Sequence, residues 1–139
     1  MEMLLRSIFA ALLGSPRANV VAAGQGVKWL AENAIAIIDA NDEVRGPPLG
    51  DPNKVARFRA AVVRCGELYG QRSRLIHGTW VEGLPDGRPG LSVVRSKWRQ
   101  PWPSAEKVKP DEIEKLAEDL ATAQEELLAA SIEVNGILA

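Results

Sequence analysis

The only histidine of the chain, His77, lies five residues after Arg72 and directly before Gly78. An imidazole can transfer protons near neutral pH, and a guanidinium group stays positively charged. Together they can bind a phosphate group and move a proton at an oxygen beside it. A structural role is the alternative, because histidine and arginine in the last turn of a helix often only bond the final carbonyls.

The sequence lacks the residues that several other kinds of catalysis need. Cys65 is the only cysteine, and on a shared helix it would lie about 18 Å from His77 along the axis, too far for a thiol and an imidazole to act together. One cysteine and one histidine do not supply the ligands of a structural zinc. The sequence has no GxxxxGK loop, and no GxGxxG follows a strand. We therefore expect no metal site, and no nucleotide-dependent enzyme of those kinds.

Charge is unevenly distributed along the chain, although its net value is only −1. Residues 54–99 hold ten basic and three acidic side chains, whereas residues 100–139 hold three and nine. This balance excludes a globally basic nucleic-acid binder but leaves a basic segment that could contact a phosphate backbone. The basic residues in question are Lys54, Arg57, Arg59, Arg64, Arg72, Arg74, Arg95, Lys97 and Arg99. The alternative is that the acidic last segment neutralises them inside the protein.

Length and composition indicate one folded domain over residues 1–139. The chain has a mass of 15.0 kDa, and 46% hydrophobic with 25% charged residues is typical of a globular protein. The opening MEMLLRSIFAALLG is too short to span a membrane, which needs about 20 apolar residues, and it lacks the charge order of a signal peptide. We expect a buried helix there, no membrane association and a cytoplasmic location.

Hydrophobic spacing predicts four helical segments. The first covers residues 2–13 and stops at Gly14, and the second runs from Ser15 to about residue 40, weakened in the middle by Gly24 and Gly26. The third begins at Asp51 and Pro52, and the fourth at Pro110. The predicted apolar faces are Met3, Leu4, Ile8, Leu12 and Leu13 in the first helix, Val55, Phe58, Val62, Cys65 and Tyr69 in the third, and Ile113, Leu116, Leu120, Ala123, Leu127 and Ile132 in the fourth.

The third helix carries the arginine and histidine pair. Its apolar series continues through Arg72 to Ile76, and Gly78 provides a stop that leaves His77 in the last turn. Two β-prone runs around LPDGRPG then predict a β-hairpin over about residues 79–98. The expected fold is mainly all-α: an antiparallel bundle of four to five helices with a short β-hairpin inserted before the last helix.

The segment RSRLIHG, residues 72–78, resembles the Rx4–6H motif of HEPN-domain proteins, and LYGQRSRLIHG resembles the form found in Apea-like members. The motif-level resemblance covers about residues 68–80, and the expected helical architecture extends it over most of the chain. Ser73 departs from the Asn, Asp or His that is common after the arginine, although it keeps a hydrogen-bonding group.

This resemblance implies a metal-independent endoribonuclease, without a cofactor, whose active cleft forms between two identical chains. Arg72 and His77 are the implied catalytic residues. Tyr69, Ser73, Arg74, Arg95 and Lys97 are the candidates for binding RNA. A toxin or defence role, with an antitoxin or other protein partner, is part of the same expectation. The alternative is a catalytically silent HEPN-like module that binds RNA, a nucleotide or a protein.

An ideal helix places residues five apart about 140° from each other around its axis. Arg72 and His77 therefore need not touch, and each can face a groove built with the partner chain. Unwinding before Gly78 is the alternative, because it would turn His77 towards Arg72. Trp80, Trp98 and Trp102 flank the hairpin and could stack on bases, although packing is the more common role of tryptophan.

Overall fold

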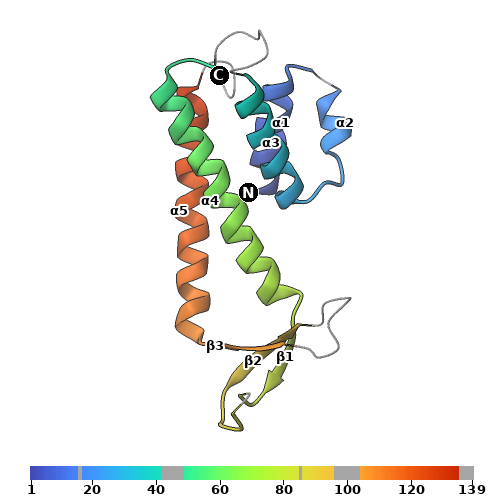
Figure 1. Cartoon of the computed structure of the whole chain (residues 1–139), viewed down its shortest axis with the longest axis vertical. Coiled ribbons are helices and arrows are strands. Elements are labelled where there is room, and N and C mark those ends of the chain that lie inside the picture. Colours follow the sequence, from blue (N-terminus) through green and yellow to red (C-terminus); the bar gives the residue numbers. More distant parts are fainter. Residues whose placement is uncertain (16, 42–48, 85, 96–103, 135–139) are drawn as a thin grey trace. The chain divides into compact units, whose positions relative to one another are not determined.

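A computed structural model describes residues 1–15, 17–41, 49–84, 86–95 and 104–134 (Figure 1). Its elements are α1 (Glu2–Leu13), α2 (Ala18–Ala22), α3 (Val27–Asn41), α4 (Pro52–Ile76), β1 (Thr79–Glu82), β2 (Leu91–Arg95), β3 (Ser104–Val108) and α5 (Pro110–Glu133). The predicted class, a helical bundle with a hairpin before its last helix, is confirmed. The chain forms two compact units, Met1–Tyr69 with Leu120–Ala139 and Gly70–Asp119. The prediction of a single domain stays a prediction.

The first unit is built around side chains from four helices. Leu5 and Ile8 of α1, Leu30 of α3, Phe58 of α4 and Leu127 of α5 are fully buried. Phe9 packs edge-on against Trp29, with ring centroids 5.2 Å apart, and so joins α1 to α3. Removing these apolar side chains from water provides the main stabilisation of the unit.

Local capping explains where the helices begin and end. Asp51 Oδ1 accepts hydrogen bonds from the amides of Asn53, at 2.7 Å, and Lys54, at 3.4 Å, and Pro52 is the first residue of α4. At the start of α5, the amide of Lys109 donates to Glu112 Oε2 at 3.0 Å. The predicted starts of both long helices are thus confirmed.

The predicted second helix is divided in two, which brings the number of helices to five among the described residues. α2 ends at Ala22, and Gly24 then takes a φ of 78°, which a helix does not allow. α3 begins only at Val27. Pro16, which directly follows the predicted start at Ser15, lies outside the described residues.

Several residues of the predicted apolar faces lie at the surface. Met3 is 82% exposed, Ile132 is 60% exposed, and Leu13 is also exposed, so their assignment to the core was wrong. Leu68 of α4, Ser131 of α5 and Val134, which follows α5, are buried in addition to the predicted core residues. The hydroxyl of Ser131 donates to the Leu128 carbonyl at 2.7 Å, which satisfies a buried polar group within the helix.

The second unit contains an antiparallel sheet in the order β1-β2-β3. The predicted hairpin is confirmed, with Trp80 opposite Val93 and Glu82 opposite Leu91. β3 was not predicted; it pairs with β2 and places Glu106 opposite Val93. None of the described helices is long and apolar enough to cross a membrane.

Candidate functional site

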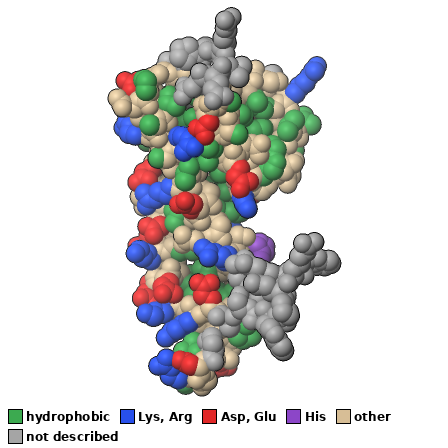
Figure 2. Space-filling model, in the orientation of Figure 1, with side chains coloured by type: hydrophobic (Ala, Val, Ile, Leu, Met, Phe, Trp, Pro, Cys, Tyr) green, Lys and Arg blue, Asp and Glu red, His purple; other side chains and the backbone are tan. Residues whose placement is uncertain are grey.

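The arginine and histidine pair lies at the C-terminal end of α4, within the second unit. His77 and Arg74 are exposed, whereas Arg72 and Ser73 are half-buried. The single histidine side chain is visible at the surface in Figure 2. The His77 imidazole is therefore accessible to a ligand.

The helical backbone continues as far as the amide of His77. This amide donates to the Ser73 carbonyl at 3.0 Å, the bond between residues four apart that defines an α-helix. His77 itself follows the last residue of α4, Ile76, so the alternative of unwinding before Gly78 stays a prediction. Continued ideal helical geometry would direct Arg72 and His77 about 140° apart, to different sides of the axis.

Gly78 ends the helix for a different reason from the one predicted. Its φ is not positive, so it does not adopt the left-handed conformation of a glycine C-cap. A Cβ at Gly78 would lie 1.9 Å from Cγ1 of Val93 and 2.9 Å from the Arg74 carbonyl oxygen. The glycine is required because the chain passes directly against β2.

Trp80 fastens β1 to the end of α4. Its indole Nε1–H donates to the Leu75 carbonyl at 2.8 Å, and this carbonyl belongs to the last turn of the helix, where it has no partner along the helix. Trp80 as a whole residue remains 40% exposed. Trp80 therefore has a structural role and still presents part of its surface to solvent.

Internal ion pairs neutralise part of the basic segment. Arg57 pairs with Glu133 at 2.5 Å and Arg64 with Glu126 at 2.7 Å, which also shows that α4 and α5 run antiparallel in the first unit. Arg59 binds both carboxylate oxygens of Asp39, at 2.6 and 2.8 Å, and this bond lowers the pKa of Asp39 and raises that of Arg59. Acidic and basic side chains are interspersed on the face that Figure 2 shows. The expected neutralisation by the acidic last segment is found for Arg57 and Arg64.

The structure describes only some of the remaining residues that were predicted to bind RNA. Tyr69 is half-buried and is the last residue of α4 within the first unit. Arg95 ends β2 opposite Ser104, but its side chain is not described. Lys97, together with Arg99, Trp98 and Trp102, lies outside the described residues. The structure therefore groups Arg72, Ser73, Arg74 and His77 by position on α4, and leaves the contribution of Arg95 and Lys97 as a prediction.

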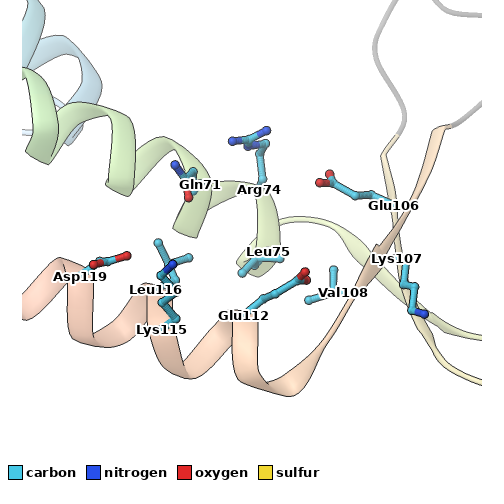
Figure 3. Close-up of a pocket in the computed structure, with 10 residues that line it drawn as sticks. All are labelled: Gln71, Arg74, Leu75, Glu106, Lys107, Val108, Glu112, Lys115, Leu116 and Asp119. Carbon is cyan, nitrogen blue, oxygen red and sulfur yellow. The ribbon is translucent and has the colours of Figure 1, made fainter.

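A cavity of about 400 Å³ lies close to this end of α4, inside the second unit. Figure 3 shows its lining from three segments: α4 gives Gln71, Arg74 and Leu75, β3 gives Glu106, Lys107 and Val108, and α5 gives Glu112, Lys115, Leu116 and Asp119. The cavity could not be predicted from the sequence because it depends on β3. The sequence of that strand, SAEKV, has no regular alternation of polar and apolar residues that would indicate it.

Cys65 has no part in this site. It is fully buried in the first unit, and its thiol donates weakly to the Ala123 carbonyl at 3.4 Å. Burial raises the pKa of Cys65 to about 11, because the thiolate would lose its hydration. The thiol is therefore a buried structural group, as its position on the apolar face indicates.

Comparison with protein-family models, curated proteins and solved structures found no match. Among the described residues, no group of three or more histidine, cysteine or acidic side chains is arranged to hold a metal ion.

Proposed function

We propose that this protein is a HEPN-like, metal-independent endoribonuclease that acts as a homodimer, in a toxin or defence role. The observation that carries this proposal is the accessible His77 on a helix end that is fixed by Gly78 and Trp80. Arg72 lies on the same helix end but leaves the axis in a different direction, so a cleft shared by two chains supplies both groups more readily than one chain does.

The proposed reaction needs only proton transfer and charge stabilisation. The 2′-hydroxyl of the RNA attacks the adjacent phosphorus, the new O–P bond forms, and the bond to the 5′-oxygen breaks. One His77 removes the 2′-hydroxyl proton, and the partner subunit's His77 protonates the departing 5′-oxygen. Arg72 stabilises the added negative charge on the pentacoordinate phosphorus. The two histidines of a dimer thus provide the base and the acid that one chain lacks.

The test is cleavage of single-stranded RNA by the full chain in EDTA. We expect products with 2′,3′-cyclic phosphate ends, and loss of cleavage in Arg72→Ala and in His77→Ala while circular dichroism shows an unchanged fold. Arg88→Ala is the matched control, because Arg88 is an exposed cation of the same unit that pairs with Asp86 in the hairpin turn. Cleavage that survives both motif substitutions would refute the proposal.

A catalytically silent HEPN-like module is the second candidate. It is favoured by the ion pairs that already engage Arg57, Arg59 and Arg64, because they reduce the cationic surface available for a long RNA. This candidate predicts binding of RNA, a nucleotide or a protein partner such as an antitoxin, without cleavage products. Affinity for RNA should then fall as salt concentration rises.

A further inference from the structure

The cavity beside α4 combines an apolar floor with two oppositely charged side chains at its mouth. Val108 and Leu116 are buried, and Leu75 is half-buried beside them. Arg74 and Glu106 are exposed, and Figure 3 shows the Glu106 side chain extending from β3 in the direction of Arg74. Neither has an ion-pair partner among the residues that the structure describes.

The charges around the cavity argue against a phosphate as its occupant. Three cations line it, and three acidic residues line it as well: Arg74, Lys107 and Lys115, and Glu106, Glu112 and Asp119. A phosphate would be attracted and repelled by similar numbers of groups. A neutral flat ring with hydrogen-bond donors on one edge and acceptors on another fits this lining better, because it can satisfy both signs and cover the apolar floor.

We propose that this cavity binds a guanine base of single-stranded RNA, with Glu106 and Arg74 as the residues that determine the base. This inference rests on the proposed function, and it specifies which base of the RNA flanks the cleavage site. Arg74 and His77 are three residues apart in sequence, so a nucleotide held in the cavity would lie in the same unit as the imidazole.

Guanine is the RNA base whose edges match both side chains. Its N1–H and N2–H₂ groups form a pair of donors that one carboxylate can accept together, and its O6 and N7 atoms form a pair of acceptors that one guanidinium can bind. Adenine and cytosine present a single amino group beside acceptors, and uracil has a single N–H between two carbonyls. None of these three can use a carboxylate and a guanidinium in this paired way.

The experiment measures binding without cleavage. The full chain is titrated with fluorescent 2′-O-methyl oligouridylates, which lack the attacking hydroxyl, carrying one central guanosine, inosine or uridine. We expect guanosine to bind about tenfold more tightly than uridine, and inosine to bind less tightly than guanosine because it lacks the N2 amino group. Equal affinity for guanosine and uridine would overturn the proposal.

Substitution of Glu106 tests whether this side chain causes the preference for guanosine. In the Glu106→Gln variant, the guanosine and inosine oligonucleotides should bind with similar affinity. Glu114→Gln is the control and should keep the wild-type order of affinities, since Glu114 is an exposed acid of α5 outside the cavity lining. An unchanged order in Glu106→Gln would overturn the assignment. The binding measurement does not depend on cleavage, because these oligonucleotides cannot be cut. A protein that prefers guanosine in this measurement but does not cleave RNA would therefore refute only the proposed function. Cleavage without base preference would refute only the guanine site.

Discussion

Gly78 holds the end of α4 against β2, and this contact predicts a large effect for one added methyl group. Gly78→Ala should lower the free energy of unfolding by about 1–3 kcal/mol, because its Cβ would overlap Val93 Cγ1 and approach the Arg74 carbonyl. Urea denaturation followed by circular dichroism measures this change. Since the contact also positions His77, the proposed RNA cleavage should fall in the same variant.

Gly70 provides the matched control for this substitution. It lies inside α4, and a Cβ there would meet no atom within 4 Å. Gly70→Ala should raise the free energy of unfolding by about 0.5–1 kcal/mol, because alanine restricts the unfolded chain and favours the helix. A stable Gly78→Ala variant would show that the helix end and β2 are not in close contact.

Cys65 gives a prediction about alkaline pH. Its pKa is about 11 in the folded protein, against the ordinary value of 9.0 for a thiol of the unfolded chain. Between these values the unfolded chain has lost the thiol proton while the folded protein keeps it, so the free energy of unfolding should decrease as pH rises. The stabilisation is complete below about pH 9 and is lost as the pH rises through about 11. It amounts to roughly 2–3 kcal/mol at most.

The comparison of wild type with Cys65→Ala isolates this effect from other alkaline titrations. Denaturation curves recorded from pH 8 to pH 10.5 should fall more steeply for the wild type than for the variant. Parallel curves would contradict the raised pKa of the buried thiol.

At the scale of elements, the two ion pairs between α4 and α5 stabilise the helix pair only modestly. A double-mutant cycle with Arg64→Ala and Glu126→Ala should give a coupling energy of about 0.2–1 kcal/mol, since both side chains are nearly half exposed. The coupling should weaken at high salt, because mobile ions screen exposed charges. A salt-independent coupling would indicate that packing, and not charge, joins these side chains.

The starts of the two long helices could be predicted from the sequence because they depend on local bonds. Asp51 and Pro52 mark the start of α4, since the cap is made by residues within one turn. Burial was predicted less well, because it depends on which neighbours cover a helix. Met3 continues an apolar series but lies where nothing packs over it, at 82% exposure.

The candidate site also has a part that could be predicted from the sequence and a part that could not. Arg72 and His77 could be found from the sequence because one short segment at the end of α4 contains both. The cavity beside them could not, since its lining comes from three segments that are distant in sequence, including the five-residue strand β3. Such a short strand carries too little periodicity to be recognised.

At the scale of the whole molecule, the proposed activity depends on association of two chains. Each chain has one histidine, and helical geometry separates it from Arg72 by about 140°. If the cleft takes groups from both chains, Arg72→Ala and His77→Ala homodimers each lack one kind of group entirely. A hybrid of the two variants keeps one Arg72 and one His77, and so it retains an acid or base together with a charge-stabilising group.

We therefore expect partial recovery of RNA cleavage when the two inactive variants are denatured together and refolded as a mixture, and none when either variant is refolded alone. Sedimentation equilibrium of the same samples should show dimers, and activity per chain should fall on dilution as the dimers dissociate. Two copies of His77→Ala refolded together serve as the control for refolding itself. Recovery would require both chains at one scissile phosphodiester, whereas a lasting monomer or an inactive mixture would refute a shared cleft.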